Sequence, residues 1–223
     1  LSKQKMMTLI SCMVFIIIGQ NLFGQAQATI DKCAKELEST IPEIRQQAAM
    51  ILGQYEEPMV TELLLAHLKD ESNLVRRAVL VSLQDRIQKR MMGLTKMIDI
   101  LDLLEDKDVE VRRLASTSAQ FFIGILLRDS FSSASERNPA PITIAQQKKI
   151  KNKFRNSLQD SDDIVRLNNL TTISQNSHIL YDPEFKNAVF MRIEDTNKSA
   201  VILALQMLKL QNNIDDKTVA EKL

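Results

Sequence analysis

Side chains that can act as acids, bases, nucleophiles or metal ligands are sparse in this sequence. His67 and His178 are the two histidines, and Cys12 and Cys33 are the two cysteines. None of them stands in the HxxxH or CxxC spacing of a zinc site, and no acidic calcium loop, glycine-rich phosphate loop or GxSxG turn occurs. We therefore predict no catalytic residue, no cofactor and no metal site, and we expect a protein that is not an enzyme.

Acidic residues are plentiful, but they recur in one short sequence motif together with an arginine. The motif reads LKDESNLVRR from Leu68, LEDKDVEVRR from Leu104 and LQDSDDIVRL from Leu158. A catalytic carboxylate pair would occur once, so repetition favours a structural role. We assign that role to a set of aspartates and arginines in the copies, namely Asp70, Asp108, Asp162, Arg45, Arg76, Arg112 and Arg166.

The residue before each of these four arginines is an anchor that defines an internal repeat, and a fifth, degenerate copy has Val201 in place of the arginine. The anchors are Ile44, Val75, Val111, Val165 and Ala200, at intervals of 31, 36, 54 and 35 residues. In each unit we predict a first helix that ends at the acidic residues of the repeated motif. An aspartate there caps a second helix, which is apolar on one face. The arginine can then reach acidic groups at the turn of its own or the adjacent repeat, which predicts a ladder of Asp–Arg contacts.

The composition indicates an all-α protein without a general affinity for polyanions. Residue types that favour helix are abundant, whereas there are only five glycines, and aromatic residues make up 4%. Sheet-rich enzymes usually need more glycine for turns and phosphate loops. The 29 basic and 28 acidic residues balance, so we expect no nucleic-acid partner.

The repeated motif resembles the DxxVRxxAAxALG pattern of HEAT-like repeats. The residues that fit it well are Asp108, Val111, Arg112 and Ala115, with Asp162, Val165 and Arg166 in the next copy. The resemblance implies a right-handed, armadillo-like α-solenoid of about five HEAT-like helix pairs over residues 29–214. It also implies a scaffold or adaptor for protein–protein interaction, which we expect to be a monomer. The alternative is the recognition arm of a larger, truncated enzyme.

Two surfaces are candidates for binding a partner. The second helices of this repeat class usually line the concave side, so positions two and three after the anchors predict a site for a protein or peptide at Gln46, Gln47, Arg77, Arg113 and Asn168. We expect glutamate at both Arg77 and Arg113 to weaken binding and to leave the melting temperature nearly unchanged. The other candidate is a basic helix with Lys148, Lys149, Lys151, Lys153 and Arg155. It is either a patch for phosphate or nucleic acid, or a solvated outer face.

Residues 1–28 predict a secretory signal peptide. Two lysines precede an uncharged apolar stretch, and small residues permit cleavage after Ala26 or Ala28. We therefore expect an exported bacterial protein, periplasmic or secreted. An uncleaved membrane anchor and a lipoprotein signal at Cys12 are the alternatives.

Two further segments depart from the repeat pattern. Residues 128–143 are rich in serine and proline and predict an inserted loop, either a tolerated insertion or a partner contact. Residues 215–223 resemble the first helix of a truncated sixth repeat, or a capping helix. Cys33 falls on an apolar helical face, which favours a small buried residue over a reactive thiol.

Overall fold

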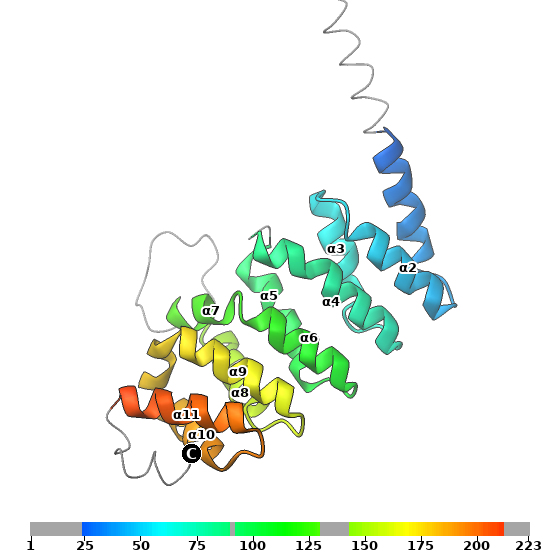
Figure 1. Cartoon of the computed structure of the whole chain (residues 1–223). Helices are drawn as coiled ribbons and strands as arrows, with labels where there is room; N and C mark the ends of the chain where they lie inside the picture. The colour runs from blue at the N-terminus through cyan, green and yellow to red at the C-terminus, as the bar shows by residue number, and fades with distance from the viewer. Residues whose placement is uncertain (1–23, 90–91, 130–142, 212–223) are drawn as a thin grey trace, which may run out of the picture.

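The computed structural model describes residues 24–89, 92–129 and 143–211, and every regular element within them is a helix. The helices form five successive pairs that stack into an elongated array (Figure 1). The first helices of the pairs are residues 24–36, α3 (Pro58–Ala66), α5 (Leu94–Leu101), α8 (Ile144–Ser157) and α10 (Pro183–Phe190). The second helices are α2 (Pro42–Leu52), α4 (Asn73–Gln88), α6 (Val109–Ala119), α9 (Asp163–Gln175) and α11 (Lys198–Leu210). The predicted all-α solenoid of five helix pairs is confirmed.

Second helices pack on second helices along the array, α2 on α4, α4 on α6, α6 on α9 and α9 on α11. Short 3-10 turns extend two first helices, η1 (Asp102–Glu105) after α5 and η3 (Met191–Glu194) after α10. The hydrophobic core therefore runs between two rows of helices, and each row has one side that faces solvent.

Local sequence fixes where the second helices begin. The carboxylates of Asp108 and Asp162 accept hydrogen bonds from the backbone N–H groups of Val111 and Val165, both at 3.1 Å. These are N-cap bonds, and they satisfy donors that the first helical turn leaves unpaired. Helix α2 begins differently: Pro42 is its first helical residue, one position after the N-cap, where its missing N–H costs nothing.

The repeat anchors lie in the core, with one exception. Val75, Val111, Val165 and Ala200 are fully buried, whereas Ile44 is 37% exposed. Ile44 is exposed because, among the described residues, α2 has no earlier second helix to cover that side.

Small residues allow close approach between neighbouring second helices. An added Cβ on Gly53 would lie 2.6 Å from the Ser82 hydroxyl oxygen, and the Ser82 hydroxyl donates to the Ala49 carbonyl at 2.9 Å. A larger residue at position 53 would push α4 away from α2. The first pair also buries Cys33, as predicted for a small core residue.

The interval between the third and fourth repeats contains a helix that we did not predict. Helix α7 (Ile123–Asp129) buries Phe122, Ile123, Leu126 and Leu127, and it packs against α8 and against η2 (Ser177–Tyr181). The predicted loop at 128–143 is thus too long at both ends, because α7 includes Asp129 and Thr143 already caps α8. Residues 130–142 lie outside the described residues.

Other predicted segments fall wholly or partly outside the described residues. The signal-peptide prediction covers 1–23, which are not described, and 24–28, which belong to the helix over residues 24–36. The predicted sixth repeat at 215–223 also lies outside. Among the residues that the structure does describe, no helix has the length and apolar character needed to cross a bilayer.

Candidate interaction surface

Four arginine–aspartate pairs, which we call the inner ladder, connect every two consecutive repeats. In each pair the guanidinium Nε and Nη2 atoms donate to the two carboxylate oxygens, at distances between 2.6 and 3.1 Å. The pairs are Arg45–Asp70, Arg76–Asp106, Arg112–Asp160 and Arg166–Asp195. These fork-shaped contacts fix both distance and orientation between neighbouring repeats.

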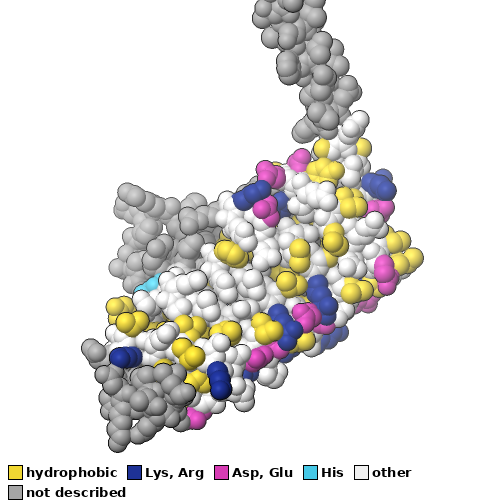
Figure 2. All heavy atoms as spheres, in the orientation of Figure 1, with side chains coloured by type: hydrophobic (Ala, Val, Ile, Leu, Met, Phe, Trp, Pro, Cys, Tyr) yellow, Lys and Arg dark blue, Asp and Glu magenta, His cyan; other side chains and the backbone are white. Residues whose placement is uncertain are grey.

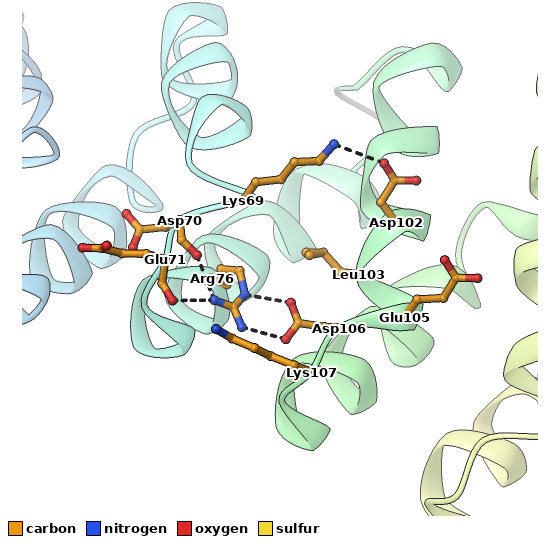
Figure 3. Close-up of a pocket in the computed structure, with 9 residues that line it drawn as sticks. All are labelled: Lys69, Asp70, Glu71, Arg76, Asp102, Leu103, Glu105, Asp106 and Lys107. Carbon is orange, nitrogen blue, oxygen red and sulfur yellow. Dashed lines mark hydrogen bonds and ion pairs between the residues drawn. The ribbon is translucent and has the colours of Figure 1, made fainter.

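The inner ladder is continuous because each of its first three aspartates receives arginines from two successive repeats. The Asp70 carboxylate accepts from Arg45, and the Asp70 backbone carbonyl accepts from Arg76 Nη1 at 2.8 Å. Figure 3 shows Arg76 held between this turn and the Asp106 carboxylate of the next repeat. Asp106 and Asp160 receive their neighbouring arginines in the same way. We assign the inner ladder to repeat stacking.

The inner-ladder carboxylates also close the turn that follows them. Asp70 accepts from the Ser72 N–H at 2.9 Å, and Asp195 accepts from the Asn197 N–H at 2.9 Å. Burial by itself would raise the pKa of Asp70, but the bonds from Arg45 and Ser72 lower it below its usual range. The pKa of Asp195 is lowered against burial in the same way.

A second set of pairs, the outer ladder, corrects two predictions. Arg77 binds Asp108 and Arg113 binds Asp162, at 2.8 and 2.6 Å. Asp108 and Asp162 were predicted as partners of the inner arginines, but those partners are Asp106 and Asp160, two residues earlier, at the start of the turn. Position 108 or 162 instead caps the next helix and faces the second arginine of the preceding repeat.

The outer ladder neutralises the arginines that we expected to make a basic binding surface. Arg77 and Arg113 are 34% and 31% exposed, and their hydrogen bonds lower the pKa of Asp108 and Asp162. Glutamate at positions 77 and 113 would place carboxylates against these aspartates. The expectation that this double change leaves the melting temperature nearly unchanged therefore does not hold.

The basic helix α8 is largely neutralised by its two neighbours. On one side Lys149 and Lys153 lie 2.9 and 3.7 Å from Asp102, and on the other Lys151 lies 3.0 Å from Asp182. Arg155 pairs with Glu184 of α10. Lys148 is exposed, and no ion pair to another described residue is found for it. The candidate phosphate patch is better described as an electrostatic contact between three consecutive first helices.

An open cavity of about 390 Å³ lies between the second and third repeats (Figure 3). Its polar walls are already engaged, since Arg76 binds Asp106, and Lys69 reaches Asp102 at 3.4 Å. Among the described residues, no cluster of His, Cys, Asp or Glu could hold a metal ion. These charged side chains of the cavity wall thus pair with one another, and they do not form a catalytic or metal-binding group.

The outward side of the second helices carries few charged groups. Figure 2 views the molecule from this side, and hydrophobic and uncharged atoms dominate its middle, whereas charged side chains gather in a row along one edge. We call this surface the second-helix face and define it by exposed or half-buried side chains: Gln46, Gln47, Met50, Val81, Leu114, Thr117, Leu167, Asn168, Thr171 and Ile202.

The second-helix face includes apolar residues that sequence reasoning missed. Met50 and Val81 are 53% and 50% exposed, and both stand six residues after an anchor. Helical periodicity places that position beside positions two and three, so this signal was available. Asn168, which was predicted, donates through Nδ2 to the hydroxyls of Ser116 and Thr117 at 3.0 and 3.2 Å.

Comparison with known proteins agrees with this geometry. Residues 30–119 match the family model of HEAT repeats, and the inner ladder continues with the same geometry through the fourth and fifth repeats. Residues 30–119 are thus HEAT repeats, and the described part of the chain is an α-solenoid of five helix pairs. The solved structure of YIBA from Escherichia coli matches with a TM-score of 0.63 at 19% identity, over 84% of this chain and 61% of that one.

An engineered protein matches this HEAT-like solenoid with a TM-score of 0.55 at 15% identity, over 80% of this chain and 77% of that one. Both likenesses show the fold alone. This chain spans about three-fifths of the length of YIBA. No curated protein sequence matches it.

Proposed function

We propose that this HEAT-like solenoid is a non-enzymatic scaffold or adaptor that binds a protein or peptide across its second-helix face. One observation carries the proposal. The second-helix face runs through all five repeats with exposed aliphatic side chains such as Met50 and Val81, while the arginines beside it are paired. Exposed apolar groups in series are typical of a surface that a partner covers.

The rival functions have less support. A nucleic-acid or phosphate site on α8 would need unpaired cations, but Lys149, Lys151 and Arg155 each contact a carboxylate. A catalytic role would need a converging set of reactive groups, whereas the carboxylates of the ladders repeat with the fold. We therefore favour binding over catalysis, with the recognition arm of a larger enzyme as the remaining alternative.

We further propose an exported, monomeric protein. The export proposal rests on the sequence of residues 1–28. Expression of the natural gene in its source cell, followed by fractionation and N-terminal sequencing, tests it. A new N-terminus at residue 27 or 29 in an extracytoplasmic fraction supports export, and a cytoplasmic chain that retains residues 1–28 contradicts it.

Selection from a random peptide library displayed on phage tests the binding function. The immobilised full chain is the bait, and selected peptides are titrated by fluorescence anisotropy against two variants. Val81→Glu places a charge in the middle of the second-helix face, and Ile144→Glu places the same charge at an 84% exposed isoleucine of α8. We expect Val81→Glu to weaken binding about tenfold or more and Ile144→Glu to have no effect. Equal binding by both variants, or loss only with Ile144→Glu, contradicts the proposal.

A further inference from the structure

We propose that the end of the second-helix face on α9 and α11 binds an aliphatic anchor of a short, uncharged peptide segment. This inference rests on the proposed function and states which kind of partner segment the surface binds. The aliphatic patch consists of Ile164 and Leu167 on α9 and Ile202 and Leu203 on α11. The two helices pack directly against each other.

The exposure of the side chains in the aliphatic patch suits the binding of an apolar side chain. Ile164 and Ile202 are 42% and 43% exposed, whereas Leu167 and Leu203 are half-buried and pack against the core. Each of the two packed helices thus carries one leucine that packs against the core and one isoleucine that is exposed to solvent. Covering such side chains contributes about 25 cal/mol for each Å² of apolar surface removed from water.

The position two residues after the anchor explains why the patch lies at this end. That position holds Arg77 and Arg113 in the second and third repeats, and both bind an aspartate across the junction. It holds Leu167 and Ile202 in the fourth and fifth repeats. The outer ladder therefore stops where the aliphatic patch begins.

The charged residues around the aliphatic patch are either bonded to a neighbouring residue or lie at its turn side. Arg166 and Asp195 bind each other in the inner ladder and are 8% and 1% exposed. Asp163 accepts a hydrogen bond from Asn197 Nδ2 at 2.8 Å. Lys198, one helical turn before Ile202, is exposed at the turn side of the patch. Lys198 and Asp163 form no ion pair with another described residue, but both lie at the turn side of the patch. The four side chains of the patch are themselves aliphatic, so the complementary side chain is apolar.

The size of the patch selects a segment over a whole protein surface. A stable interface between folded proteins uses about 20–30 residues on each side, and this patch has four. A second copy of the chain would bury too little here to form a lasting dimer. A linear segment can dock one anchor in the patch and hydrogen-bond through its backbone. Asn168, beside Leu167, uses its Nδ2 group for Ser116 and Thr117 and keeps acceptor capacity on Oδ1.

Methyl NMR on the full chain tests this inference. The isoleucine δ1 methyl groups are labelled, and three pools of capped peptides are added, each with one anchor position in a background of Ser, Thr and Gln. The anchor is Leu, Ile or Phe in the first pool, Lys or Arg in the second, and Asp or Glu in the third. We expect only the first pool to shift the Ile164 and Ile202 methyl signals, equally at about 0.05 and about 0.5 M salt, because an apolar contact is not screened.

Two variants provide the matched control. Ile202→Glu should weaken binding of the first pool about tenfold, and Ile144→Glu should leave it unchanged. Absence of shifts at Ile164 and Ile202, a stronger response to a charged pool, or shifts that appear on concentrating the chain without peptide would each overturn the inference. If the first pool loses binding with Val81→Glu and keeps it with Ile202→Glu, its peptides bind elsewhere on the second-helix face; that result would overturn this inference while the proposed function stands.

Discussion

The central and terminal junctions of the solenoid are held together differently. The inner ladder crosses all four junctions between repeats, whereas the outer ladder is found at the two central ones, Arg77–Asp108 and Arg113–Asp162. The first junction has Gln46 and Ser72 at the matching positions, and the last has Leu167 and Asn197. Stacking thus depends on the inner ladder, and the position two residues after the anchor is available for other uses at the ends.

Loss of an inner-ladder arginine is the most damaging single change that we predict. Arg76→Ala would leave Asp106 unpaired, and these side chains are 5% and 8% exposed. Removing one partner of a buried pair costs about 3–5 kcal/mol, which urea denaturation measures. As a control, Arg76→Met combined with Asp106→Leu should recover much of the loss. A cost below about 1 kcal/mol for Arg76→Ala would contradict a stacking role.

Acid should destabilise the solenoid by a smaller amount through both ladders. The pKa of Asp70, Asp108, Asp162 and Asp195 is lowered in the folded state. A lowered pKa stabilises the fold above the unfolded value of about 3.9 and loses that effect as the pH falls below it. The free energy of unfolding should therefore fall from about pH 5 to about pH 3. Asp162→Asn should show a smaller fall, and an identical pH profile would exclude Asp162 as a contributor.

An outer-ladder arginine should matter less than an inner one. Arg77→Ala removes a pair whose arginine is 34% exposed, and such pairs contribute about 0.2–1 kcal/mol. Added salt should weaken the contribution further, because the pair is partly screened. A cost equal to that of Arg76→Ala in the same urea experiment would remove the distinction between the two ladders.

Adding an outer pair at the first junction should give the smallest effect, a gain in stability. Gln46→Arg with Ser72→Asp copies Arg77–Asp108, and Ser72 makes no side-chain capping bond of its own. We expect a gain of a few tenths to about 1 kcal/mol from the new cap and pair. The single change Gln46→Arg serves as the control and should give little. A loss of stability in the double variant would show that the end junction differs in geometry.

Much of this architecture could be predicted from the sequence because it repeats. The offsets from Asp70 to Arg76 and from Asp106 to Arg112 are equal, so the helix pairs and the inner arginines follow from one pattern. What could not be predicted depends on how neighbouring repeats meet. The partners of Arg77 and Lys151 lie in the next repeat, and their distances are set by packing. Helix α7 was not predicted, because its short apolar stretch directly before the insertion resembles a continuation of α6.

The central claim is that the ladders hold the stack while the second-helix face remains available for a partner. Its most direct test is isothermal titration calorimetry of a selected peptide, paired with melting temperatures, for Val81→Glu and for Arg77→Ala combined with Arg113→Ala. The account predicts that Val81→Glu loses binding and melts like the wild type, whereas the double arginine variant melts lower and binds normally. The reverse pattern, with binding lost only when the arginines are removed, would contradict it.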